Sequence, residues 1–437
     1  MVRKEAYQTI LRVFKDREFS DTLLRQRAKR LKNDHANVAL FYSMVKGVIK
    51  LRGKLDYILA QHADAARFAA TDIKIKAWLY LGLYQLMYLD SIPAHAAINE
   101  TVELAKENLG DKVGDFVNAM LRAWQRNPEV VWPTDPIPRI ASEHSYPPEL
   151  IERWITLWGE EDTEYLAIWY NENPKLHLRV NGTATTREKL IQYFAKREIR
   201  VTPSPVGKMT LLTDEADAVL DDVAFSEGYF SIQDTSSALI VELLDPKPEE
   251  NILDLFAAPG GKCSYIAEIL NNSGEVVAVD KIPNKMKLLK QAADRLQLNN
   301  IKLIVSDAFL YGPVAPAYDR VLVDAPCSGW GVFGRKADLR WQAHQNIEEL
   351  VKLQERALDL GASFVRPEGI MVYSTCTMNP DENERQIEKF LARNPRFTLI
   401  DAVEKLPRDL CPGGMFRSLP FRHNMDGAFA AKMIKTR

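Results

Sequence analysis

Cysteine is scarce in this sequence, and its scarcity excludes two kinds of protein. The chain of 437 residues holds four cysteines, at positions 263, 327, 376 and 411. That number is too small for the disulfide framework of a small secreted protein, and no Cys-x-x-Cys pair is present that would indicate a structural zinc site. We therefore expect a reduced, cytoplasmic protein with no bound metal.

Long hydrophobic runs are also missing. The best candidate, "AWLYLGLYQLMYL" at 77–89, is too short to cross a bilayer and contains a glutamine. The first residues, "MVRKEAYQTILRVF", are charged and amphipathic, which is not typical of a signal peptide. These absences predict that the protein has no membrane partner.

The chain as a whole has no large excess of positive or negative charge, but its first 54 residues are strongly basic. The formal net charge is −2, which does not indicate a general polyanion binder. Residues 1–54, however, contain 14 Lys and Arg against 5 Asp and Glu, a net charge of +9. This basic head fits a nucleic acid or another anionic partner. It also fits an ordinary solvated helix surface, and charge alone leaves both interpretations open.

The hydrophobic pattern divides the chain into four parts. Residues 1–130 have apolar side chains every three or four positions, which predicts an all-α bundle. The Pro-rich stretch 131–149 is typical of a linker. Residues 150–234 mix helical and alternating patterns, as in a small α+β subdomain. From 235 to 437 strands alternate with helices, which predicts a mostly parallel, doubly wound sheet of the Rossmann-like α/β class. Its expected strands are 251–257, 275–280, 301–307, 319–326 and 369–376.

A glycine turn after the first of these strands is a candidate cofactor loop. The stretch "FAAPGGK" joins a strand to a helix, and its glycines allow a ligand to approach the backbone at the free N–H groups of the helix start. It is neither a dinucleotide fingerprint nor a Walker loop. The candidate binding residues of the loop are Phe256, Ala257, Ala258, Pro259, Gly260, Gly261 and Lys262.

Three acids follow the next three strands and strengthen this assignment. Asp280, Asp307 and Asp324 stand at the carboxyl ends of successive strands, where open α/β sheets bind ligands. Asp280 lies about twenty residues beyond the glycines, the place of a ribose-binding acid. The pattern indicates a cofactor with a nucleoside. The lack of a phosphate-binding motif favours S-adenosylmethionine over a nicotinamide dinucleotide.

Two cysteines end the fourth and fifth strands at the same edge. Cys327 lies in "VDAPCSGWG" and Cys376 in "VYSTCTMNPDENE", where Asn379 and Pro380 are expected to start a helix. Carbon 5 of a pyrimidine accepts a methyl group only after a thiolate has added to carbon 6, which is a form of covalent catalysis. Asp324 is placed to act as an acid near N3 of cytosine, and a second thiol could assist product release.

These motifs resemble the RNA 5-methylcytosine methyltransferases of the Nop2/Sun type. The similarity rests on "FAAPGGK", "VDAPCSGWG", "VYSTCTMNPDENE", "SIQDTSSAL" at 231–239 and "LPFRHNMDGAFAAKMIK" at 419–435. The leading helices, with "IPAHAAINETVELAK" and "FVNAMLR", are similar to the NusB-type RNA-binding fold. The combination is that of family members acting on the small ribosomal subunit, and it spans nearly the whole chain.

The resemblance implies a role for several residues. Cys376 becomes the nucleophile, Cys327 helps to release the product, and Lys262 lies near the target base. The cofactor becomes S-adenosylmethionine, and the substrate one cytosine of 16S rRNA, usually numbered 967, in an unassembled or partly assembled subunit. We expect the protein to act as a monomer.

The sequence departs from the family pattern at four positions. Phe256 stands where the family usually has cysteine, and Cys263 where Thr or Ser is common. Ala337 replaces a frequent proline and Ala428 a common aromatic residue. These changes put cofactor contacts and RNA fit in question but leave the two cysteines and three acids intact.

Three other functions compete with this interpretation. An RNA chaperone with an inactive methyltransferase domain would bind RNA without turnover. The two intact cysteines argue against this alternative, because an inactive site does not need both thiols. The same chemistry on transfer RNA is disfavoured by the NusB-like head. DNA methylation is disfavoured because the DNA enzymes attack with the Pro-Cys cysteine and need no Thr-Cys partner.

Overall fold

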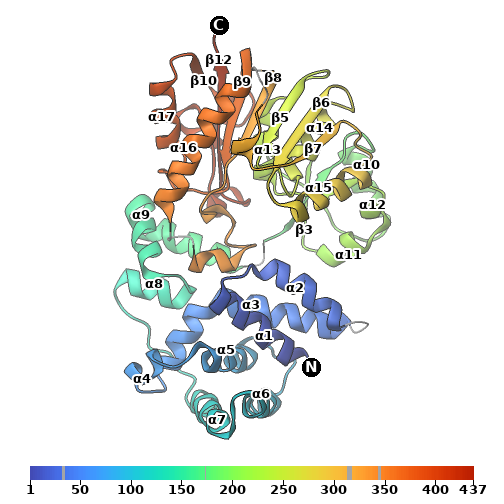
Figure 1. The fold of residues 1–437 in the computed structure, drawn as a ribbon. Coiled ribbons are helices and arrows are strands. Elements are labelled where there is room, and N and C mark those ends of the chain that lie inside the picture. Colours follow the sequence, from blue (N-terminus) through green and yellow to red (C-terminus); the bar gives the residue numbers. More distant parts are fainter. Residues whose placement is uncertain (32–34, 173, 313–316, 343–345) are drawn as a thin grey trace. The chain divides into compact units, whose positions relative to one another are not determined.

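The computed structural model describes residues 1–437 except 32–34, 173, 313–316 and 343–345. The chain forms two compact units (Figure 1). The first comprises Met1–Glu172 and Phe333–His344, and the second comprises Asn173–Val332 and Gln345–Arg437. Among the described residues, no helix combines the length and the apolar character that a membrane span requires.

The first unit is the predicted all-α bundle. Its apolar spacing forms a core around Trp78, which is fully buried and stacks on Tyr7 with ring centroids 4.1 Å apart. The amphipathic stripes of neighbouring helices close this core, as the three-to-four spacing predicts. The first seven helices are α1 (Val2–Asp16), α2 (Ser20–Ala28), α3 (His35–Ala60), α4 (Ala65–Ala69), α5 (Ile73–Tyr88), α6 (Ala94–Leu109) and α7 (Asp111–Arg126).

The predicted linker at 131–149 is wrong for most of its length. Residues Pro136–His144 form helix α8, whose Ile140 and Ala141 are buried. Pro136 and Pro138 occupy the first turn of α8, where the missing N–H costs nothing. Helix α9 (Pro148–Asn171) follows, and its backbone is non-helical at Gly159 (φ 83°). Helix α9 belongs to the first unit and not to the small α+β subdomain.

A segment from the far end of the sequence completes the first unit. Phe333–His344 lies within the range assigned to the methyltransferase domain but packs with the helices. Its short 3₁₀ helix η4 (Ala337–Trp341) carries Arg340, which is fully buried and donates to the Tyr170 carbonyl (2.9 Å) and to Asn171 Oδ1 (2.7 Å).

The predicted α+β subdomain forms the start of the second unit. Its antiparallel sheet has the order β2-β3-β1-β4 and packs on helix α10 through Phe194 and Phe230. The elements are β1 (Leu176–Val180), α10 (Arg187–Ala195), β2 (Thr202–Pro203), β3 (Thr210–Thr213), α11 (Ala216–Asp221), α12 (Val223–Ser226) and β4 (Phe230–Ile232).

The larger sheet confirms the predicted α/β class. Its order is β10-β12-β9-β8-β5-β6-β7, with β11 paired to β12, and the pairs among β5 to β9 are parallel. The five expected strands form, and four of them end one or two residues before the expected end. The strands are β5 (Asn251–Leu255), β6 (Glu275–Asp280), β7 (Ile301–Val305), β8 (Tyr318–Asp324), β9 (Val365–Thr375), β10 (Phe397–Ile400), β11 (Phe416–Ser418) and β12 (Ala428–Lys435).

Helices cover both faces of this sheet (Figure 1). Alternate residues of one strand enter different cores: Leu322 lies in one, and Val321 and Val323 lie in the other. This period of two gives the central strands an apolar layer on each face. Because β5 to β9 are parallel, their carboxyl ends meet at one edge of the sheet. The helices are α13 (Thr235–Leu244), α14 (Gly261–Ile269) and α15 (Pro283–Arg295) on one face, α16 (Ile347–Phe364) and α17 (Glu384–Arg393) on the other, and the short α18 (Pro420–His423).

Candidate active site

The predicted cofactor loop runs from the end of β5 to the start of α14. Phe256 has φ 64° and Gly260 has φ 105°, both in the left-handed region. A Cβ atom at Gly260 would lie 2.2 Å from Leu289 Cδ1, so both the backbone conformation and the packing require glycine there. The peptide bond between Ala258 and Pro259 is cis. The loop thus brings backbone N–H groups to the carboxyl edge of the sheet.

The three predicted acids lie at the strand ends but have different partners. Asp280 Oδ2 accepts from the Ala258 N–H (3.2 Å) and therefore fastens the loop to β6. Asp307 caps a 3₁₀ turn by accepting from the Phe309 N–H (3.0 Å). A capping role is the ordinary one for such an aspartate and leaves its second oxygen available.

Asp324 forms an ion pair with Lys262. Its Oδ2 accepts from Lys262 Nζ (2.7 Å) and its Oδ1 from Ser374 Oγ (2.8 Å). Burial lowers the pKa of Lys262, but the Asp324 carboxylate and the charge of Cys376 outweigh burial and raise it. Lys262 is therefore an ammonium ion that faces both Asp324 and Cys376.

The two predicted cysteines are brought together. Cys327 Sγ lies 3.2 Å from Cys376 Sγ and also accepts from the Cys376 N–H (3.3 Å). The hydrogen bond with Cys376, burial and the nearby negative charges raise the pKa of Cys327 well above its usual range. Cys327 consequently keeps its proton, while the Lys262 ammonium favours the thiolate form of Cys376.

Sequence reasoning missed Asp254, which lies below this edge on β5. Its side chain is fully buried, and neither oxygen has a hydrogen-bond partner among the residues that the structure describes. Burial and the Asp324 charge raise the pKa of Asp254 well above its usual range, although Lys262 opposes the shift. A buried acid that interrupts an apolar strand pattern is the only sign the sequence offers, and it needs a partner from a ligand or a proton.

The turn after Cys376 also differs from the prediction. The expected helix does not start at Asn379 and Pro380, because α17 begins at Glu384. Asp381 and Glu382 therefore precede the helix instead of occupying its first turn. The Glu382 carboxylate accepts hydrogen bonds from the N–H and the hydroxyl group of Ser328, the residue after Cys327.

The four departures from the family pattern lie in packed positions. Phe256 lies beside Phe309 with ring centroids 6.0 Å apart, and Cys263 is fully buried against the same core as Ala428. Ala337 packs on the helical core of the first unit. None of the four contacts the cysteine pair through a hydrogen bond that the described residues show.

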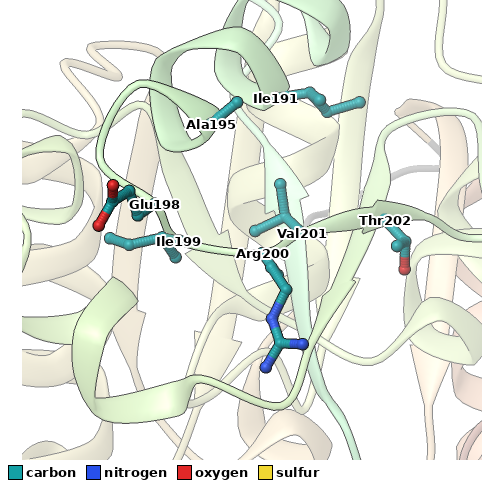
Figure 2. A pocket seen from close by; sticks show the side chains of 7 residues that line it. All are labelled: Ile191, Ala195, Glu198, Ile199, Arg200, Val201 and Thr202. Atoms are coloured by element: carbon teal, nitrogen blue, oxygen red, sulfur yellow. The ribbon is translucent and has the colours of Figure 1, made fainter.

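A hollow of about 350 Å³ lies elsewhere, in the small α+β subdomain. Figure 2 shows that its walls come from helix α10 and the following segment, with Arg200 and Glu198 among the side chains. None of the predicted site residues lines it. Its full lining is Ile191, Ala195, Glu198, Ile199, Arg200, Val201 and Thr202.

Glu143, His144 and Glu164 form a cluster in the first unit whose potential ligand atoms lie within 4.8 Å of one another. Arg139 already supplies the positive charge, because its guanidinium pairs with Glu164 and Glu143. The cluster is a salt-bridge network on α8 and α9.

Comparison with known proteins matches each part of the chain. The model described as "16S rRNA methyltransferase RsmB/F" matches residues 241–434, the NusB family model matches 1–126, and an RsmF/B-like ferredoxin-like domain model matches 146–219.

Two relatives that match along most of their length are described as methyltransferases of small-subunit ribosomal RNA. The chain is 36% identical to the probable ribosomal RNA small subunit methyltransferase B of Bacillus subtilis (strain 168), covering 99% of this chain and 98% of that protein. It is 35% identical to the corresponding probable enzyme of Synechocystis sp., with 90% of each chain covered. The solved structure of a protein called PH0851 has a TM-score of 0.82, 25% identity, and coverage of 99% and 98% of the two chains. With its NusB, ferredoxin-like and methyltransferase parts, the chain belongs to the RsmB/F family of 16S ribosomal RNA methyltransferases.

Proposed function

We propose that this chain methylates carbon 5 of one cytosine of 16S rRNA, the position usually numbered 967, through a covalent cysteine–C6 adduct. The observation that carries the proposal is the pair of thiols 3.2 Å apart beside the Lys262–Asp324 pair. A methyltransferase that acts on an oxygen or an exocyclic nitrogen needs no thiol, whereas C5 methylation needs one to activate the ring.

The residues at the sheet edge fit S-adenosylmethionine as the methyl donor. Asp254 offers a buried carboxyl group without a partner among the described residues, and Asp280 adds a second acid beside the loop. A cationic ligand offsets the cost of such buried acids better than a phosphate would. When bound, S-adenosylmethionine supplies an electrophilic methyl group on a positively charged sulfur.

The chain's own residues carry the remaining steps. The Cys376 thiolate adds to carbon 6. The Lys262 ammonium transfers a proton to the Asp324 carboxylate, and the resulting carboxyl group donates this proton to N3 of the cytosine. Carbon 5 is then nucleophilic and takes the methyl group. A base then removes the C5 proton, assisted by Cys327, and the Cys376 thiolate leaves carbon 6, so that the C5–C6 double bond forms again as the C6–S bond breaks. N3 returns its proton to Asp324.

The substrate is expected to be unassembled or partly assembled small-subunit RNA, bound by a monomer of the protein. The basic head of 1–54 supports RNA binding through phosphate contacts. Its helices lie in the unit that the NusB family model matches. Salt dependence of RNA affinity is the direct check on this contribution.

The test is transfer of labelled methyl from S-adenosylmethionine to undermodified 16S rRNA, with the modified nucleotide mapped. We expect label at a single cytosine with wild-type protein, and none with Cys376→Ala. Cys411→Ala is the matched control, because burial raises the pKa of Cys411 to about 11 and this thiol lies outside the site. Label that persists in Cys376→Ala would refute the nucleophile. Tight RNA binding without transfer would favour the chaperone alternative.

A further inference from the structure

Glu382 is a fully buried acid between the two loops that carry the cysteines. Its side chain has 0% exposure, and it lies in the turn between Cys376 and helix α17. A buried carboxylate is strongly unfavourable unless it is well hydrogen-bonded. The hydrogen-bond partners of this carboxylate therefore indicate the role of Glu382 in the structure.

Five neutral donors surround the carboxylate. Oε2 accepts from the Ser328 N–H and from Gln354 Nε2, both at 2.9 Å. Oε1 accepts from Ser328 Oγ (2.5 Å) and Asn379 Nδ2 (3.0 Å), with a longer contact from Thr377 Oγ1 (3.5 Å). None of these donors is an N–H group of α17, so the acid does not cap that helix.

Three of the five donors belong to the two residues that follow the cysteines. Ser328 comes directly after Cys327, and Thr377 directly after Cys376. Their hydroxyl oxygens lie 2.8 Å apart, so the carboxylate and the two hydroxyl groups join the loops. Because Ser328 is held by both its backbone N–H and its side chain, the peptide that precedes it is fixed, and with it the Cys327 sulfur.

The charge of Glu382 acts on the same thiol. The titratable groups around Cys327 are Cys376, Glu382 and Tyr373, whose hydroxyl donates to the Glu382 carbonyl (2.7 Å). The hydrogen bond with Cys376 and burial contribute most to the raised pKa of Cys327, and the Glu382 charge adds to it. Beyond Cys376 lie Lys262 and its partner Asp324.

We infer that Glu382 is the positioning residue of the thiol pair. It holds the loops of Cys327 and Cys376 together so that one sulfur attacks the base while the other remains a protonated thiol beside it. This inference rests on the proposed function and deepens it. It assigns no contact between Glu382 and the substrate.

The first experiment compares Glu382→Ala and Glu382→Gln with Asp381→Asn, a matched control whose side chain pairs with the exposed Arg385. We expect Glu382→Ala to lower kcat for methyl transfer on the order of 100-fold, as misplaced catalytic groups do. The dissociation constant for S-adenosylmethionine should change little, since the side-chain hydrogen bonds of Glu382 go to Ser328, Gln354, Asn379 and Thr377 and not to the cofactor loop. Glu382→Gln can keep the Ser328 N–H bond and should lose on the order of tenfold. Asp381→Asn should behave as wild type.

A second readout needs no RNA. Diamide takes two electrons and two protons from a pair of thiols and becomes a hydrazine as the disulfide forms. The Cys327–Cys376 disulfide should form quickly in wild type and in Asp381→Asn, more slowly in Glu382→Ala, and not at all in Cys327→Ala. If wild type transfers no methyl group but forms this bond at the expected rate, the proposed function fails while the positioning role stands.

The pH profile separates positioning from bulk structure. Mass spectrometry of the Cys327 peptide after iodoacetamide treatment gives the pH midpoint of its alkylation. Glu382→Gln should lower this midpoint because a negative charge is removed, and Asp381→Asn should not. The inference is overturned if Glu382→Ala keeps wild-type kcat and disulfide rate, if it weakens cofactor binding as much as turnover, or if Glu382→Gln leaves the midpoint unchanged.

Discussion

Replacement of Arg179 by methionine tests how the small subdomain supports the cofactor loop. Arg179 lies on β1 and is fully buried. Its guanidinium donates to Glu268 and Ser264 of α14 and to the Gly261 carbonyl (2.8 Å) at the start of that helix. The substitution preserves much of the side-chain volume but leaves Glu268 as a buried acid without its cation.

The expected magnitude follows from that geometry. Breaking a buried ion pair costs about 3–5 kcal/mol, because one charge stays behind without compensation. For a unit of this size each kcal/mol lowers the melting temperature by about 2–4 °C, so the transition of the second unit should fall by about 6–20 °C. The double variant Arg179→Met/Glu268→Leu should recover most of the loss, since it removes both charges.

Differential scanning calorimetry of the full chain measures this shift, and Arg200→Met is the matched control. Arg200 pairs with Glu215 at an exposed position of the same subdomain, so its loss should leave the transition nearly unchanged. The cofactor dissociation constant of Arg179→Met should rise on the order of tenfold as the start of α14 loosens.

The pH dependence supplies a further check. Burial raises the pKa of Glu268, and Arg179 opposes that shift. Removal of Arg179 raises the pKa further, so the folded state binds the proton more tightly than the unfolded state. The stability deficit of Arg179→Met should therefore shrink as the pH falls through the folded-state pKa of Glu268. A loss below about 3 °C, or a double variant as unstable as the single one, would refute the reasoning.

The remaining predictions concern the site itself. Cys376→Ala should abolish methyl transfer while equilibrium dialysis still shows wild-type cofactor binding, and loss of both would indicate a folding defect instead of a missing nucleophile. Cys327→Ala should accumulate a covalent protein–RNA adduct that migrates slowly on a denaturing gel, whereas rapid turnover without such a band would contradict the release role. Asp280→Asn should weaken cofactor binding by about tenfold and RNA binding very little, and filter binding with each ligand distinguishes the two effects.

The local sequence pattern predicted which side chains lie at the carboxyl edge of the sheet, and the reason is physical. A strand between two apolar layers is recognisable from its composition, and the polar residue that ends it must lie at the carboxyl edge. Asp324 and Cys327 from one segment and Cys376 from another could therefore be brought together. Asp254 and Glu382 could not, because their roles depend on three-dimensional burial: one interrupts a buried strand, and the other resembles an ordinary acid at a helix start.

The same limit explains the boundary between the two units. Arg340 and Trp341 lie in a charged, loop-like stretch that has the composition of a solvent-exposed segment. Their burial comes from partners almost 300 residues away in the sequence: Trp341 Nε1 donates to the Ile49 carbonyl (3.1 Å), and Arg52 lies over its ring. When a side chain is buried because it donates to backbone carbonyls of a distant helix, the hydrophobic pattern of the neighbouring sequence does not show that burial. This segment begins six residues after Cys327. If the chain were divided after residue 172, the N-terminal fragment would therefore lose part of its core. The C-terminal fragment would carry Arg340 without its partners Tyr170 and Asn171.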